Sequence, residues 1–145
     1  INILNEKKGP PPEINLFNEK NNGETVLKLI EEGLIKSAHD VSLGGIITAV
    51  SKMAIKGKKG FKLNKLKVLI NKFDYYFGED QGRYIIEIEP KNLSKVQKIL
   101  KDNSVHFDEI GLVTEKDIIL DKEPIIHIDD LVKSNTNWLK EYMDK

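Results

Sequence analysis

Two short segments of the chain hold the residues whose types and spacing could support chemistry. The first contains a histidine, an aspartate, a serine and two glycines: His39, Asp40, Ser42, Gly44 and Gly45. A short predicted strand at 35–41 leads here into an amphipathic helix predicted at 43–56, and the unpaired N–H groups of a first helical turn attract phosphate. We expect Ser42 to cap this helix, with both glycines inside its first turn.

The glycines and the polar pair of this segment each have two interpretations. Glycine in a first helical turn costs about 0.5–1 kcal/mol relative to alanine, so close approach of a ligand or of another chain segment is expected to offset that cost. His39 and Asp40 either face a cleft, for proton transfer or substrate contact, or serve the fold. In the second interpretation His39 is half-buried and bonded to the backbone, and Asp40 helps to cap the following turn.

The second segment, 77–84, places the only arginine of the chain beside two acids. Arg83 has the planar fork that binds a phosphate or a carboxylate through two parallel N–H bonds, which lysine does not provide. Glu79 and Asp80 could reach a metal ion, although adjacent side chains diverge unless the backbone turns between them. The alternative is a loop held together by an internal pair between Arg83 and one of these acids.

Composition limits what else the chain can be. Its 145 residues fit one ordinary domain, and a formal net charge of +0 argues against a general nucleic-acid binder. No apolar run approaches the ~18–20 residues of a membrane-spanning helix. The absence of cysteine excludes disulfides and cysteine-based nucleophiles or metal sites. His39, His106 and His127 are isolated in the sequence, so no zinc site is expected.

The spacing of the apolar residues predicts alternating helices and strands. Helices are expected at 14–34, 43–56 and 93–100, and from about Asp129 onward, and residues 71–78 are expected to form a short helix or a turn. Strands are expected at 35–41, 61–70, 83–89, 105–113, 118–120 and 125–128. Short connections and the absence of long strand–helix–strand repeats predict an α+β fold, with a mixed, mostly antiparallel sheet and helices packed on it.

Particular residues are expected to shape these elements. The run 21–23, Asn-Asn-Gly, is expected to interrupt or distort the first helix, and the strand at 61–70 is expected to lie at a sheet edge. Asn92 is a candidate helix cap, and residues 121–124 form a plausible turn. Trp138 is expected to anchor the last helix against the body of the domain.

The first residues differ in composition from the rest of the chain. Residues 1–13 are polar and contain three consecutive prolines, which favour an extended segment, so we predict a linker from a missing upstream domain. Residues 14–145 are predicted to form a single domain.

Taken together, the two chemical segments resemble a known enzyme family. Residues 37–45 resemble the Ala-His-Asp-Val-Ser-Asp-Gly-Gly signature of phosphoribosylformylglycinamidine synthases, and 77–84 resemble the Phe-Gly-Glu-x-Gln-x-Arg segment of the same enzymes. Further similarities are the Gly-Pro-Pro-Pro run at 9–12, a helix ending in Gly33-Leu34, the strand at 110–113, and the closing Trp138, Tyr142 and Met143. One departure is Leu43, which stands where the family usually has an acid.

The resemblance implies the C-terminal domain of a small-type synthetase subunit, related to the C-terminal half of aminoimidazole ribonucleotide synthetase. The complete enzyme uses ATP and Mg²⁺ to convert formylglycinamide ribonucleotide to the amidine, with ammonia derived from glutamine, in purine biosynthesis. The implied substrate- or phosphate-binding candidates are His39, Asp40, Ser42, Gly44, Gly45 and Arg83, with Glu79 and Asp80 in a supporting loop. No catalytic residue and no metal ligand are assigned.

The same resemblance carries expectations about partners. It implies upstream domains of the same chain, a separate glutaminase subunit and a small accessory subunit, in the cytoplasm, with no nucleic acid and no membrane. The fragment alone is expected to hold neither ATP nor Mg²⁺ and to catalyse nothing.

Two other classes of protein remain open. One is the C-terminal domain of a related enzyme: aminoimidazole ribonucleotide synthetase, thiamine monophosphate kinase, selenophosphate synthetase or a hydrogenase maturation protein. The segment 77–84 argues against these relatives. The other is a module that packs on a partner and binds no ligand.

Overall fold

The computed structural model describes residues 13–64, 71–120 and 123–144. Residues 1–12 of the predicted linker, 65–70 of the predicted strand and 121–122 of the predicted turn lie outside these ranges. The helices are α1 (Leu16–Glu31), α2 (Gly45–Gly57), α3 (Lys72–Phe77), α4 (Leu93–Asp102) and α5 (Ile128–Met143), with a short 3₁₀ turn at Pro90–Asn92. The strands are β1 (Ile35–Asp40), β2 (Gly60–Leu63), β3 (Tyr84–Ile88), β4 (Gly111–Thr114), β5 (Asp117–Leu120) and β6 (Ile126–His127).

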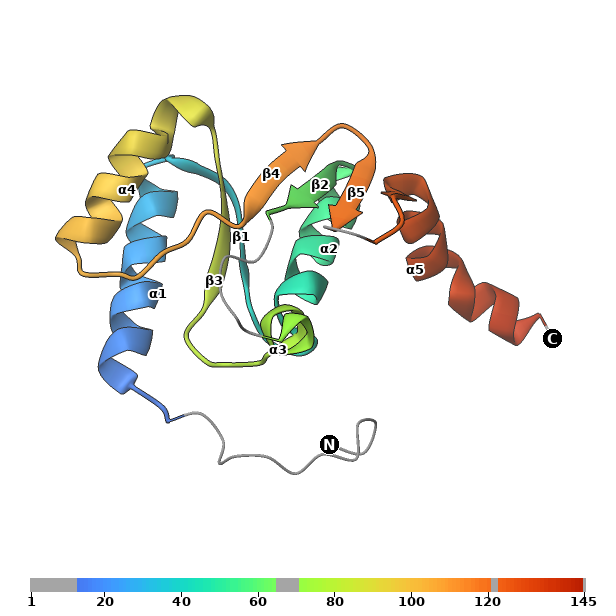
Figure 1. Cartoon of the computed structure of the whole chain (residues 1–145), viewed down its shortest axis with the longest axis horizontal. Helices are drawn as coiled ribbons and strands as arrows, with labels where there is room; N and C mark the ends of the chain where they lie inside the picture. Colours follow the sequence, from blue (N-terminus) through green and yellow to red (C-terminus); the bar gives the residue numbers. More distant parts are fainter. Residues whose placement is uncertain (1–12, 65–70, 121–122, 145) are drawn as a thin grey trace.

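The described strands form two sheets rather than one (Figure 1). Strands β1 and β3 pair antiparallel as a two-stranded ribbon, and the second sheet has the order β4-β2-β5-β6. In the second sheet β2 runs parallel to β5, while the β2–β4 and β5–β6 pairs are antiparallel. The predicted α+β class with mixed, mostly antiparallel pairing is therefore confirmed.

The β1–β3 ribbon lies between two hydrophobic cores. Alternate side chains of a strand point to opposite faces, and in β3 Ile85 packs against one core while Ile86 and Ile88 pack against the other. The second of these cores lies under α1 and α4, with Leu29 and Val96 fully buried at its centre. The first core lies between α2 and the four-stranded sheet.

Strand β2 was expected at a sheet edge, and this prediction was wrong. It pairs with β4 on one side and β5 on the other, and its Phe61 and Leu63 are buried in the first core. The alternation of this strand is weak because three of its four residues, Gly60, Phe61 and Leu63, are buried and only Lys62 is exposed. Residues 105–110, also expected as strand, form none, and β4 begins only at Gly111.

Two helix predictions need correction. Asn92 occupies the position before α4, but its side chain does not cap the helix and instead donates to the carbonyl oxygen of Leu34 at 3.1 Å. Trp138 is 60% exposed, because the second half of α5 extends away from the body of the domain (Figure 1). None of the described helices has the length and apolar composition needed to span a membrane.

Candidate functional site

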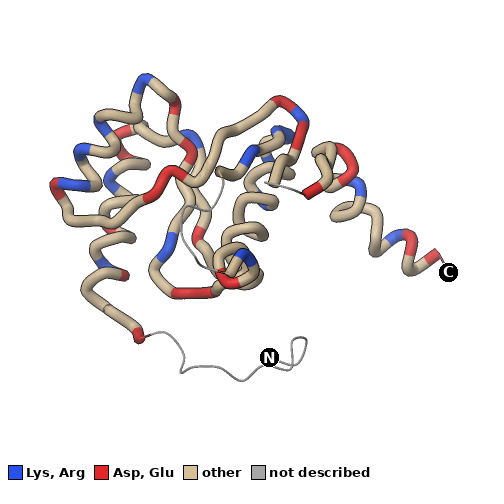
Figure 2. The backbone as a smooth tube through the Cα atoms, in the orientation of Figure 1, with Lys and Arg blue, Asp and Glu red and all other residues tan. Residues whose placement is uncertain are grey.

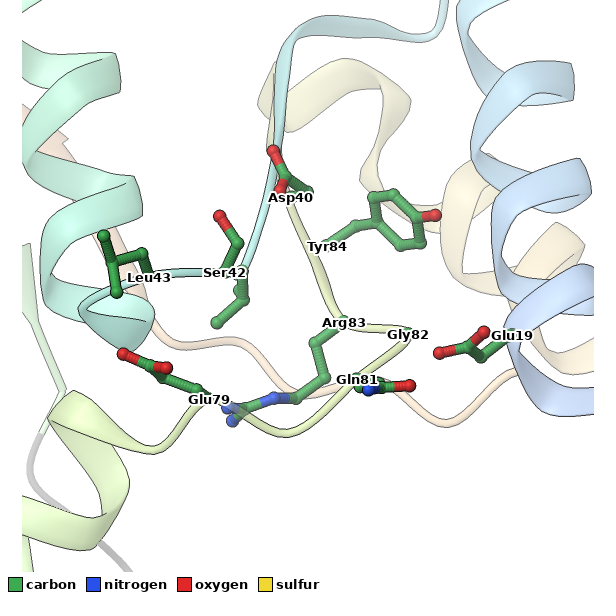
Figure 3. A pocket seen from close by; sticks show the side chains of 10 residues that line it. Glu19, Asp40, Ser42, Leu43, Glu79, Gln81, Gly82, Arg83 and Tyr84 are labelled. Carbon is green, nitrogen blue, oxygen red and sulfur yellow. The ribbon is translucent and has the colours of Figure 1, made fainter. Parts of the chain in front are cut away.

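A pocket of about 370 Å³ lies where the turn between β1 and α2 meets the loop between α3 and β3, with α1 as its third wall (Figure 3). Its lining residues are Glu19, Asp40, Val41, Ser42, Leu43, Glu79, Gln81, Gly82, Arg83 and Tyr84. The two segments singled out in the sequence are thus brought together in space, because β1 pairs with β3 and the segments adjoin these strands. Four of the predicted site residues line the pocket: Asp40, Ser42, Glu79 and Arg83.

His39 is not one of the pocket-lining residues. Its side chain is half-buried on β1, and its Nδ1 lies 2.6 Å from the carbonyl oxygen of Asp40 and 3.2 Å from the Asp40 carboxylate. This geometry corresponds to the interpretation in which His39 is bonded to the backbone. Asp40, the next residue, does reach the pocket, since neighbouring side chains of a strand point in opposite directions.

Helix α2 begins at Gly45, and its cap differs from the prediction. Gly44 occupies the cap position in the left-handed conformation with φ 83°, and Ser42 makes no side-chain cap bond. The N–H of Gly44 instead donates to Oε1 of Glu79 at 2.8 Å. The first turn of α2 contains no acidic residue of its own, so the Glu79 carboxylate supplies the negative charge that favours a helix N-terminus.

The cost of glycine at the start of α2 is offset by close approach of another chain segment. Gly45 has φ 67°, and a Cβ atom there would lie 2.6 Å from the carbonyl oxygen of Tyr76 and 2.7 Å from Cα of Phe77. The backbone of α3 therefore packs directly on the first residue of α2. Of the two explanations offered by the sequence, this one accounts for Gly45.

Arg83 organises the loop between α3 and β3. Its Nη2 donates to the carbonyl oxygen of Gly78 at 2.6 Å and lies 3.3 Å from the Asp80 carboxylate, while Nε donates to the Asp80 carbonyl oxygen at 3.3 Å. The internal pair between arginine and acid is thus present. Nη1 has no partner among the described residues, and the side chain, 31% exposed, lines the pocket.

Helix α1 contributes residues that the sequence analysis missed. The run 21–23 does not interrupt this helix, which is continuous from Leu16 to Glu31. Asn22 instead donates through Nδ2 to the carbonyl oxygen of Gly82 at 2.9 Å, and Gly23 leaves room for the hydroxyl of Tyr84. The signal for this contact was the run itself, because asparagine and glycine are unfavourable inside a helix unless packing requires them.

The pocket lining carries more negative than positive charge. Three acids, Glu19, Asp40 and Glu79, line the pocket together with one arginine, Arg83 (Figure 3), and Figure 2 shows the acidic residues of the loop between α3 and β3. Such a lining accepts hydrogen bonds from hydroxyl and amide groups of a ligand, while a phosphate is favoured only beside Arg83. No cluster of three or more metal-ligating side chains occurs in the described ranges.

The fold and the paired motifs agree with the comparison with known protein families. Residues 2–121 match the family described as AIR synthase related protein, C-terminal domain, and the chain belongs to this family. At the level of individual proteins, the chain is 69% identical over 142 residues to the phosphoribosylformylglycinamidine synthase subunit PurL of Pelagibacter ubique. That match covers 98% of this chain and 20% of the relative, so the chain spans about a fifth of its length.

Solved structures of a Thermotoga maritima protein have the same fold. The structure of PurLQS from this organism gives a TM-score of 0.71 at 22% identity, over 83% of this chain and 22% of that one. Structures described as T. maritima PurL complexed with FGAR and with ATP give TM-scores of 0.69 and 0.66, also at 22% identity. They cover 82% and 78% of this chain and 21% of each of those chains.

Proposed function

We propose that this chain is the C-terminal domain of an ATP-dependent ligase. The full-length enzyme would convert formylglycinamide ribonucleotide to formylglycinamidine ribonucleotide, with ammonia derived from glutamine, in purine biosynthesis. The observation that carries the proposal is the 69% identity to a phosphoribosylformylglycinamidine synthase subunit over 98% of the chain. The pocket supports it, because both resembling segments contribute to one lining.

Within this proposal the pocket residues divide into those that meet a ligand and those that hold the loop. Arg83 binds a phosphate through the guanidinium edge that its loop contacts leave available. Asp40 and Ser42 hydrogen-bond to hydroxyl or amide groups, while Gly44 and Gly45 let the start of α2 pack on Glu79 and α3. His39 orients Asp40, while Glu79 and Asp80 fix the turn and the loop on which the ligand rests.

The cofactors and partners of the full-length enzyme belong to the same proposal. ATP and Mg²⁺ would act in that enzyme, bound mainly by its preceding domains. A glutaminase subunit would supply ammonia, and a small accessory subunit would be a further partner; the PurLQS assembly of the T. maritima relative is consistent with such partners. The assembly would work in the cytoplasm.

The test uses the full-length synthetase with formylglycinamide ribonucleotide, ATP, Mg²⁺ and ammonia, and measures the amidine product. We expect Arg83→Lys to raise the KM of a phosphate-bearing substrate, because lysine does not reproduce the bidentate fork. Asp80→Asn is the matched control, since it weakens the same loop pair but leaves the guanidinium in place. Unchanged constants in Arg83→Lys, or equal changes in both variants, would remove Arg83 from the binding site.

A module that packs on a partner without binding ligand is the second candidate. The internal bonds of Arg83 and Glu79 and the close contact at Gly45 favour it, because each of these features is explained by packing alone. A thermal-shift measurement of the full-length protein with ATP, ADP and Mg²⁺ tests the difference. A ligand that binds only the native state must raise Tm, and this rise should shrink in Arg83→Lys if the domain takes part in binding.

A further inference from the structure

The second half of α5 extends away from the body of the domain (Figure 1). It bears large apolar side chains that are exposed. Trp138, Leu139, Tyr142 and Met143, here called the α5 apolar face, are 60%, 51%, 72% and 74% exposed. Residues three or four positions apart lie on one side of a helix, so these four side chains form a continuous surface. Four large apolar residues in sequence proximity are unusual for a face that remains in water.

The α5 apolar face continues a buried seam of the same helix. Ile128 is fully buried in the first core, and Leu131 and Val132 pack against that core. Successive steps of three, four or seven residues lead from these positions to Trp138, Leu139 and Tyr142. The opposite side of α5 is polar: Asp130, Lys133, Asn137, Lys140 and Glu141. The sequence pattern of α5 is therefore typical of a helix whose apolar side is buried along its whole length. The described residues bury only the first half of that side.

The comparisons indicate where the covering surface belongs. The family match ends at residue 121, before α5 begins, whereas the match to the Pelagibacter synthase subunit leaves only three residues of this chain outside it. Helix α5 is thus shared with the synthetase relative and lies outside the part matched to the general family. Since the chain spans 20% of that relative, most of such a polypeptide lies outside the structure.

We propose that the α5 apolar face docks on another part of the same full-length synthetase polypeptide, outside these 145 residues. This docking rests on the proposed function, because the longer polypeptide is inferred from the match to a synthase subunit of which this chain spans 20%. A permanent contact is favoured over an exchangeable one, since the face has no charged member and permanent interfaces resemble a domain core more than transient ones do. It also continues the apolar side formed by Ile128, Leu131 and Val132, with Asn135 as the one polar residue between them.

Site-specific photocrosslinking in the full-length protein tests this docking. The photoreactive residue p-benzoylphenylalanine replaces Tyr142 in one variant and Asn137, on the opposite side of α5, in the matched control. Irradiation is followed by mass spectrometry, with an equal mixture of isotopically light and heavy protein to separate contacts within one polypeptide from contacts between copies. We expect the Tyr142 position to crosslink within its own polypeptide, to peptides outside this chain, with a several-fold higher yield than the Asn137 position.

Two results would overturn the docking. One is crosslinking mainly to a second copy or to a separate glutaminase subunit, and the other is an equal yield at the two positions. The synthetase reaction is assayed on the same preparations, so that the two proposals fail separately. Turnover without the intramolecular crosslink contradicts the docking, whereas the crosslink without turnover contradicts the proposed function.

Discussion

Gly45 carries two constraints at once, a left-handed backbone and direct contact with α3. Alanine at φ 67° is strained by about 1–2 kcal/mol, and its Cβ would lie within 2.7 Å of the backbone of α3, which adds about 1–3 kcal/mol of overpacking. We therefore expect Gly45→Ala to lower the free energy of unfolding by about 2–5 kcal/mol. Urea denaturation followed by circular dichroism measures this change.

Gly57, at the other end of the same helix, is the matched control. It has an ordinary backbone conformation, and a Cβ there would meet nothing within 4 Å. Gly57→Ala is expected to leave stability unchanged or to raise it by up to about 1 kcal/mol, since alanine is the better helix former. Equal denaturation midpoints for the two variants would mean that α3 does not rest on Gly45.

Among the described residues, Glu89 has the most strongly shifted pKa. The Nζ atoms of Lys36 and Lys91 lie 2.7 and 2.6 Å from its carboxylate oxygens, and their hydrogen bonds and charges lower its pKa from the usual 4.5 to about 2. The unfolded chain binds this proton more readily than the folded chain does. The stabilisation by Glu89 is therefore complete above about pH 4.5 and is lost as pH falls toward 2.

Glu89→Gln isolates this effect. We expect the difference in denaturation midpoint between the original chain and the variant to be largest near neutral pH and to shrink between pH 4.5 and 2. High salt should reduce the difference at every pH, because these groups lie at the surface and are screened. A difference that does not depend on pH would show that the side chain acts through packing instead of charge.

At the scale of elements, the spacing of apolar residues predicted most of the helices and strands. The predictions failed for polar residues that can either act on their own helix or bond to another segment. The amphipathic pattern located α2 and α4, and strict alternation located β3. Serine is a residue type that commonly caps helices, but Ser42 does not cap α2. Gly44 occupies the cap position, and its N–H donates to Glu79, 35 residues further along. A bond between distant segments leaves no local signal, so it could not be predicted.

The candidate site shows the same limit. The turn at Asp40 and Ser42 and the loop at Glu79 and Arg83 were predicted because glycines and charged groups concentrate there. The third wall, formed by α1, was missed because Asn22 was interpreted as a helix breaker. Its side chain reaches the pocket loop only in the folded chain, and a sequence pattern contains no information about that distance.

Asn22→Ala tests whether α1 positions the pocket loop. The variant loses the half-buried bond to Gly82 and gains helix propensity, so we expect a net loss of about 1 kcal/mol in the free energy of unfolding. Hydrogen exchange in residues 79–83 should become faster, because the loop loses its anchor. Asn18→Ala, an exposed change of the same type in the same helix, should speed exchange in this loop little or not at all.

Unchanged exchange in residues 79–83 of the Asn22→Ala variant would mean that the bonds of Arg83 alone hold the loop. A combined Asn22→Ala and Arg83→Lys variant then measures their coupling. A loss greater than the sum of the single losses indicates that both contacts stabilise one loop conformation.

At the scale of the whole molecule, the β1–β3 ribbon joins the two hydrophobic cores. Ile85 packs against the first core and Ile86 against the second, although they are neighbours on one strand. Opening either core therefore exposes a face of the same ribbon. Coupling of this kind favours unfolding in a single transition, in contrast to two independent subdomains.

Leu29→Ala tests this coupling from the second core. Leu29 is fully buried, so the cavity should cost about 2–5 kcal/mol, whereas Leu27→Ala, at an exposed position of the same helix, should cost little. Hydrogen exchange is followed at the most protected amides of α4, beside the change, and of α2, in the first core. If the ribbon couples the cores, Leu29→Ala lowers the protection of both helices by the same free energy. Protection that falls in α4 and remains unchanged in α2 would instead establish that the first core unfolds on its own, with the ribbon dividing the molecule.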